Sequence, residues 1–114
     1  MVGQFSKPID KHGALQPMRV IALKALREFW ETHPNARQQL QSWYEDAKHA
    51  VWPSPSDIKA IYRNASIVAN NSVIFNIKGN DYRLIVVVNY RFGIAYIRFV
   101  GTHAEYDRID ATQI

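Results

Sequence analysis

Residues 73–100, VIFNIKGNDYRLIVVVNYRFGIAYIRFV, decide the fold class of this chain of 114 residues. Apolar residues recur in this stretch with a period of two, and turn residues interrupt it at Gly79-Asn80 and Phe92-Gly93. The pattern predicts strands over residues 73–78, 82–90 and 94–100, preceded by a short strand over residues 66–69. Strands joined by such short turns form an antiparallel meander.

Helical spacing governs the chain before this meander. Apolar residues at three- and four-residue steps predict a helix over residues 23–31 and a second over 36–51, separated at His33-Pro34, which together make a helical hairpin. Residues 54–57 (SPSD) fit an N-cap, a proline in the first turn and the acid of a capping box, and predict a short third helix ending near Asn64. Residues 19–23 are either a short strand or the lead-in to the first helix.

Helices followed by strands predict an α+β domain over residues 18–114, with the hairpin and the short third helix packed on a twisted antiparallel sheet. Residues 1–17 contain glycine, proline and polar residues without periodicity, and we expect them to be a flexible N-terminal extension.

The composition excludes several classes of protein. The absence of cysteine excludes a disulfide scaffold, thiol catalysis and a thiolate zinc site. The longest apolar run, residues 84–88, is far shorter than the roughly 20 residues of a membrane-spanning helix. Because the N-terminus also lacks the pattern of a signal peptide, we expect a cytoplasmic protein without a membrane partner.

Basic residues are concentrated in the second half of the chain. The net charge is +4, and residues 58–103 contain Asp81 as their one acid against a set of bases: Lys59, Arg63, Lys78, Arg83, Arg91 and Arg98. A concentrated basic region favours an anionic partner such as nucleic acid, and the alternative is an ordinary solvated surface.

The predicted turns assign residues to the two faces of the sheet. With two-residue turns at both hairpins, Asn76 pairs with Arg83, and Val87 pairs with Arg98. One face is then free of charge, includes Phe99, and packs on the helices. The other mixes apolar residues with cations and amides: Asn76, Lys78, Arg83, Asn89 and Arg98. We favour a polyanion site on this face over the alternative, the wet side of a half-exposed sheet.

Residues 101–107, GTHAEYD, leave the last strand at the edge of that face. His103 is the candidate acid or base, because histidine is the side chain best suited to proton transfer at neutral pH. Glu105 and Asp107 could join it in a metal site only if the segment is extended, so neither a metal nor a cofactor is expected. His33 and His49 are interpreted as structural.

Four blocks of the sequence resemble the HigB-type toxins of bacterial toxin–antitoxin pairs, within the RelE superfamily of small ribonucleases. The blocks are KALREFWETHP (24–34), SPSDIKAIYRNA (54–65), VIFNIKGNDYRL (73–84) and YIRFVGTHAEYD (96–107). The resemblance covers most of residues 18–114. It implies a RelE-like fold and a metal-free endoribonuclease that cuts mRNA, usually on the translating ribosome. It also implies a HigA-type helix-turn-helix antitoxin as partner.

The resemblance implies roles for the residues named above. Arg83 and Arg98 would stabilise the phosphate, and Lys78 would position the substrate or neutralise its charge. His103 would be the acid or base, while Tyr106 would stack a base or transfer a proton. Many RelE-type sites carry two alternating basic residues where this chain has Asn76 and Lys78, so the chemistry is expected to depend more on His103. The RNA-binding candidates are Lys78, Asn76, Arg91 and Lys59.

Two other functions compete with this one. The basic region 58–103 would suffice for a non-catalytic module that binds RNA or the ribosome. The chain could instead be a protein-interaction domain anchored by an exposed Trp30, Trp43 or Trp52, of which Trp52 is the best candidate for an antitoxin contact.

Overall fold

The fold comes from a computed structural model, which describes residues 17–111 and residue 113. Apart from Pro17, the expected N-terminal extension lies outside these residues. The elements, in chain order, are β1 (Arg19–Ile21), α1 (Leu23–Thr32), the 3₁₀ turn η2 (Pro34–Ala36), α2 (Arg37–His49), α3 (Pro55–Ile61), β2 (Ser66–Val68), β3 (Ser72–Ile77), β4 (Tyr82–Asn89), β5 (Ile94–Thr102) and α4 (His103–Tyr106).

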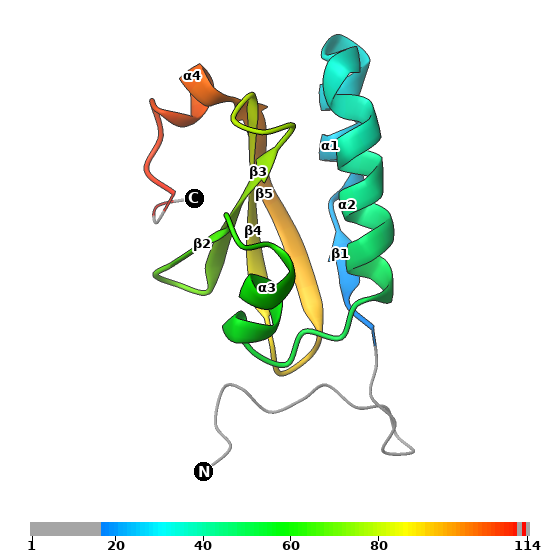
Figure 1. Cartoon of the computed structure of the whole chain (residues 1–114), viewed down its shortest axis with the longest axis vertical. Coiled ribbons are helices and arrows are strands. Elements are labelled where there is room, and N and C mark those ends of the chain that lie inside the picture. The colour runs from blue at the N-terminus through cyan, green and yellow to red at the C-terminus, as the bar shows by residue number, and fades with distance from the viewer. Residues whose placement is uncertain (1–16, 112, 114) are drawn as a thin grey trace.

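The five strands form one sheet in the order β1-β5-β4-β3-β2. Strands β2 to β5 make the predicted antiparallel meander, whereas β1 pairs parallel to β5. The α+β prediction is therefore confirmed, but the sheet is mixed rather than wholly antiparallel. A strand of three residues is too short to show a period, and its parallel pairing depends on the long connection through the helices. Figure 1 shows α1 and α2 on one side of the sheet and α4 on the other.

The core lies between α1, α2 and α3 and one face of the sheet. Alternate strand residues of the predicted uncharged face are buried there: Val73, Phe75, Ile77, Leu84, Val86, Val88, Ala95 and Ile97. Leu26, Leu40 and Ile58 meet them from the three helices. None of the helices within residues 17–111 is long and apolar enough to cross a membrane.

Two of the tryptophans proposed as exposed anchors belong to this core. The solvent-exposed fractions of Trp43 and Trp52 are only 3% and 1%, and both rings pack against Phe75. Their burial removes both residues from the alternative of an exposed anchor, because α2 and the segment that follows it lie directly over the sheet. Trp30 is half-buried.

The third helix begins at the predicted residue, but its capping differs. Ser54 is the N-cap, yet its hydroxyl donates to Asp57 Oδ2 at 2.7 Å instead of accepting a backbone N–H, so the predicted capping box is wrong. The helix ends at Ile61, before Asn64, since the backbone of Tyr62 leaves the helical region and its ring packs edge-on against Phe75.

The predicted register is right in one hairpin and wrong in the other. Asn76 pairs with Arg83 as expected. In the second hairpin Asn89 pairs with Ile94, so Val87 faces Tyr96 and not Arg98. The side chain of Asn89 accepts the N–H of Phe92 at 2.9 Å, and this bond stabilises a longer loop than the expected two-residue turn.

A β-bulge opposite Ile85 and Val86 then shifts the register again. It leaves Arg98 without a paired residue, while Phe99 pairs with Ile85 and Val100 with Leu84. One extra residue reverses the alternation of the strand. Phe99 therefore lies on the face opposite to the one predicted for it, and Val100 packs on the core.

Candidate active site at one end of the sheet

The turn between β3 and β4 and the helix α4 meet at one end of the sheet (Figure 1). Lys78 and Gly79 both adopt positive φ angles, of 52° and 64°, which bend the chain sharply out of β3. The N–H of His103 donates to the carbonyl of Asp81 at 3.1 Å. This bond holds the first residue of α4 against the turn. His103 therefore lies next to residues that are separated from it in the sequence by β4 and β5.

A capping box begins α4. Thr102 Oγ1 accepts the N–H of Glu105 at 3.1 Å, and Glu105 Oε1 accepts the N–H of Thr102 at 2.8 Å. The backbone hydrogen bond from Thr102 lowers the pKa of the Glu105 carboxyl, an effect that its burial partly opposes. Glu105 is thus occupied in the cap, which explains an acid next to a predicted polyanion site.

Asp107 has a different role from Glu105. Its Oδ2 lies 3.1 Å from His103 Nδ1, one helical turn away, and both side chains are about half exposed. A carboxylate at Nδ1 favours the tautomer that carries its proton there and leaves Nε2 to accept or donate a proton. The contact is the one that a residue orienting the His103 imidazole requires.

Arg83 is held by the turn on one side and by α4 on the other. Its guanidinium donates to the backbone carbonyls of Asn80 and Tyr82, both at 3.2 Å, and to Asn80 Oδ1 at 3.3 Å. It also lies over the ring of Tyr106, 5.7 Å from the centroid. These contacts fix a cation on the face opposite the core.

Asp107 and five of the predicted site residues therefore gather at this end, the five being His103, Arg83, Tyr106, Lys78 and Asn76. Asn76 is the cross-strand partner of Arg83. Lys78 follows β3 directly, and its Nζ lies 4.0 Å from Asp81 Oδ2, a loose and exposed contact that leaves the ammonium accessible. The group thus combines a histidine–carboxylate pair, a fixed guanidinium, an ammonium and a phenol: His103, Asp107, Arg83, Lys78 and Tyr106.

The other predicted residues lie elsewhere. Arg98 is exposed at the bulge, over the ring of Tyr96, roughly 10 Å along the sheet from the level of Arg83. Arg91 lies in the loop at the far end of β4, roughly 25 Å away. Lys59 donates to the carbonyls of Arg63 and Ala65 and so secures the exit from α3. The structure does not bring these three residues to the cluster.

Several contributors gave no signal in the sequence. Asn80 and the carbonyl of Asp81 position Arg83 and His103, and such backbone contacts depend on the fold alone. His33 stacks on Phe29 at 4.1 Å, which supports its structural interpretation. Its ring also lies edge-on to that of Tyr82, the cross-strand partner of Thr102, so α1 ends near the start of α4.

Phe99 and Gly101 are a second pair that the sequence did not connect. A Cβ built on Gly101 would come within 2.5 Å of the Phe99 ring and 3.1 Å of Glu105 Oε1. Gly101 is also the cross-strand partner of Arg83. The missing side chain at this position therefore lets the Phe99 ring lie against the backbone next to the cluster.

The helical form of residues 103–106 argues against the arrangement that a metal site would require. Glu105 turns back to Thr102, whereas Asp107 turns to His103. Within residues 17–111 and 113, no group of three or more histidine, aspartate or glutamate side chains comes together as a ligand set.

The region of the chain that matches a known family contains the whole cluster. The family model described as HigB_toxin, RelE-like toxic component of a toxin-antitoxin system, matches residues 36–109. The mRNA interferase toxin HigB of Escherichia coli strain K12 is 28% identical over 92 residues, which are 79% of this chain and 88% of that protein. The mRNA interferase HigB of Escherichia coli O6:H1 is 23% identical over 94 residues, 81% of this chain and 91% of that protein.

Proposed function

This chain belongs to the HigB family of RelE-like toxins, and on that premise we propose that it is the toxin of a type II toxin–antitoxin pair and an endoribonuclease that cuts mRNA. We further propose that the reaction needs no metal and takes place in the cytoplasm, on messages under translation by the ribosome. The partner that silences it would be a HigA-type antitoxin with a helix-turn-helix. The observation that carries the catalytic part is the His103–Asp107 pair beside Arg83.

Metal-free cleavage of RNA needs a proton acceptor and a proton donor. A base removes the proton of the 2′-hydroxyl, the oxygen attacks phosphorus, and the bond to the 5′-oxygen breaks as an acid protonates that oxygen. The products are a 2′,3′-cyclic phosphate and a 5′-hydroxyl. His103 Nε2 supplies one of these two proton transfers, since Asp107 holds the other ring nitrogen at 3.1 Å.

Tyr106 is our candidate for the group that complements His103. It lies on the same turn of helix, and its ring is in contact with Arg83, so the phenol and the guanidinium face the same volume. A flat ring there can also stack an unpaired base, as single-stranded RNA recognition requires.

Arg83 and Lys78 would stabilise the negative charge that develops on the phosphorane. A guanidinium already fixed by Asn80 and Tyr82 needs little reorganisation when the charge appears, which is the condition under which electrostatic stabilisation is largest. Arg98, farther along the sheet, would bind a neighbouring phosphate of the same strand.

The test is expression of the full chain with mapping of RNA 5′ ends. Wild type should arrest growth and produce new 5′-hydroxyl ends within coding sequences, whereas His103→Ala and Arg83→Ala should do neither. Purified protein with programmed ribosomes, and with naked RNA, would then separate translation-dependent from free cleavage. RNA that is bound in a salt-sensitive way but stays intact would support the non-catalytic RNA-binding module instead.

A further inference from the structure

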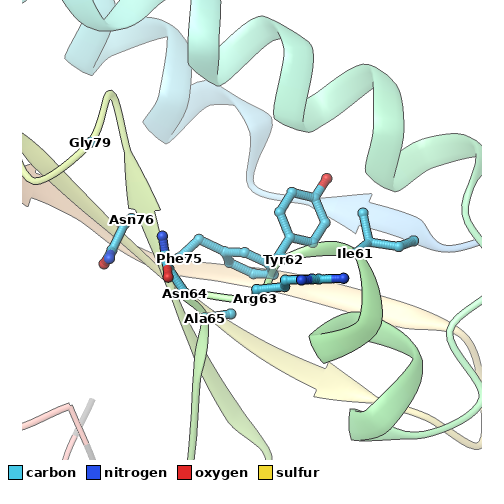
Figure 2. Close-up of a pocket in the computed structure, with 8 residues that line it drawn as sticks. All are labelled: Ile61, Tyr62, Arg63, Asn64, Ala65, Phe75, Asn76 and Gly79. Carbon is cyan, nitrogen blue, oxygen red and sulfur yellow. The ribbon is translucent and has the colours of Figure 1, made fainter.

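A hollow opens between β3 and the segment that joins α3 to β2. It has a volume of about 260 Å³, and its lining residues are Ile61, Tyr62, Arg63, Asn64, Ala65, Phe75, Asn76 and Gly79. Figure 2 shows the rings of Tyr62 and Phe75 in the middle of this hollow, with Asn64 and Asn76 towards the Gly79 end. The catalytic proposal above uses none of the aromatic or amide groups of this hollow.

A second hollow adjoins the first and lies between β3 and α2, which contributes Gln39, Ser42 and Asp46 to its lining. It has a volume of about 180 Å³ and shares Tyr62, Phe75 and Asn76 with the first, while Lys78 lies in its wall. Both hollows follow the edge of β3, because β2 pairs only with the first half of that strand, up to Ile74. We call the two together the β3-edge groove.

Tyr62 forms a rigid aromatic wall of the groove. Its ring packs edge-on against Phe75, at 5.0 Å, and against Trp52, at 6.1 Å, and its hydroxyl donates to Asp46 Oδ2 at 3.3 Å. Burial raises the pKa of the Tyr62 phenol, so the wall stays uncharged at every physiological pH. An uncharged aromatic wall accepts the face or the edge of a nucleobase without repelling the phosphate beside it.

Asn64 and Asn76 provide polar groups that can read a base edge. Each amide offers a donor and an acceptor side by side, which matches the pair that adenine presents, and the guanidinium of Arg63 matches the two acceptors of guanine. The first hollow has no acidic residue in its lining, and the one acid in the lining of the second, Asp46, accepts the hydroxyl of Tyr62. Among the residues described, the composition of the groove therefore suits a purine that carries an anionic backbone.

The groove lies next to the place proposed for the scissile phosphate, because Asn76 in its lining pairs with Arg83 across the two strands. Asn76 is the cross-strand partner of Arg83, and paired residues lie about 5 Å apart across an antiparallel ladder. Lys78 both lines the groove and stands at the turn that holds Arg83. An unpaired base in the groove would thus belong to a nucleotide adjacent to the phosphate at Arg83.

We propose that the β3-edge groove is a base-recognition site that holds an unpaired purine of the RNA next to the cleaved bond, with Asn64 reading its edge against the wall of Tyr62. The inference rests on the proposed function, because it takes the Arg83 cluster as the place of the scissile phosphate. It adds a specificity-determining residue, Asn64, in a connecting segment outside the sheet and α4.

Binding by the purified full chain tests the proposal without any cleavage. The probes are labelled oligoribonucleotides of seven residues with 2′-O-methyl groups throughout, identical except for A, G, C or U at the central position. Wild type should bind one purine probe about fivefold or more tightly than the pyrimidine probes. Asn64→Ala should remove that preference, whereas Gln38→Ala, an exposed amide on α2 that lines neither hollow, should keep it.

Mapping of cleavage ends provides the second measurement. If wild type cuts RNA and Asn64→Ala changes the base composition at one position flanking the cuts, the proposal is supported. Cleavage with the same base composition in both proteins, or equal binding of all four probes by wild type, overturns it. A purine preference in binding that depends on Asn64, in a protein that cuts no RNA, would retain the groove and reject the endonuclease. Thermal unfolding of Asn64→Ala establishes that the variant is folded.

Discussion

The two ends of the sheet are built alike, yet only one of them assembles a candidate site. We call the end with residues 78–83 and 102–107 the α4 end, and the end with the loop 90–93 and the last residues of α2 the loop end. Each has a glycine with φ near 65° and an arginine over an aromatic ring, Arg83 over Tyr106 and Arg91 over Phe92. The loop end is tied to α2 through β1, as Arg19 donates to Gly93 and Met18 to Ala50.

The two ends differ because a helix, α4, packs against the turn at one of them, and within residues 17–111 no such helix directly follows the loop at the other. At the α4 end Arg83 is half-buried and its guanidinium has three hydrogen bonds, and α4 adds a histidine and its carboxylate. At the loop end Arg91 is exposed, and its partner Phe92 keeps 63% of its surface exposed. An arginine over a ring is therefore common surface chemistry, and the site depends on the convergence of two segments from distant parts of the sequence.

The largest expected effect separates two histidines that each contact a carboxylate one helical turn away. His103→Ala should lower the rate of RNA cleavage about 100- to 10,000-fold, the range for loss of a general acid or base. His49 lies near the loop end, with Nε2 3.7 Å from Glu45, and His49→Ala should leave the rate unchanged. Single-turnover cleavage by the two purified variants measures this, and equal losses would remove the distinction between the ends.

The next effect compares the two arginines over rings. Arg83→Ala should reduce cleavage about 100- to 1,000-fold, as expected for removal of a preorganised group that stabilises the transition state. Arg91→Ala should change it less than about twofold, since an exposed cation far from the phosphate contributes mainly to non-specific attraction. A strong loss in Arg91→Ala would mean that RNA spans the entire sheet.

Asp107→Asn tests what the carboxylate at the end of α4 contributes to catalysis. The variant should reduce the turnover number about tenfold with little change in KM, because the amide no longer fixes the His103 tautomer but the phosphate-binding cations remain. Steady-state kinetics separates these parameters. A rise in KM at constant turnover would instead assign Asp107 to substrate binding.

The smallest effect concerns how α4 is held at its end of the sheet. Glu105→Gln should destabilise the protein at neutral pH, since the ionised carboxylate accepts the N–H of Thr102. Because folding lowers the pKa of this carboxyl, its contribution is present above the unfolded value and is lost as the pH falls through the folded value.

Thermal unfolding of wild type and Glu105→Gln should therefore show a gap at pH 7 that closes below pH of about 4. Thr102→Ala removes the other half of the box and should cost about 1 kcal/mol at either pH. A gap between wild type and Glu105→Gln that is independent of pH would contradict the role of the charge.

The comparison of the two ends also explains which parts of the structure the sequence could predict. Period and turn residues predicted the helices, the meander and the pairing of Asn76 with Arg83, because these follow from local patterns. The predicted register of the second hairpin was wrong because the side chain of Asn89 stabilises a longer loop and a bulge at Arg98 shifts the pairing. Neither contact leaves a periodic signal.

The candidate site divides in the same way. His103, Arg83, Lys78 and Asn76 could be proposed from residue type, strand alternation and family resemblance, and the structure brings them together. The burial of Trp52 and the hollow beside Asn64 could not be predicted, as they depend on how α2 and the α3–β2 segment pack over β3. Arg91 and Lys59 were chosen for charge alone, and charge carries no information about position.

The bulge at Arg98 sets the orientation of everything that follows it in the chain. α4 starts directly after β5, so the unpaired residue determines the side of the sheet from which the helix departs. Deleting Arg98 would remove the bulge and reverse the alternation of all residues of β5 that follow it. His103 would then be directed towards the layer of α1 and α2. At this position an alignment gap would consequently be far more disruptive than any exchange of one amino acid for another, and a relative lacking the residue would need a differently built site.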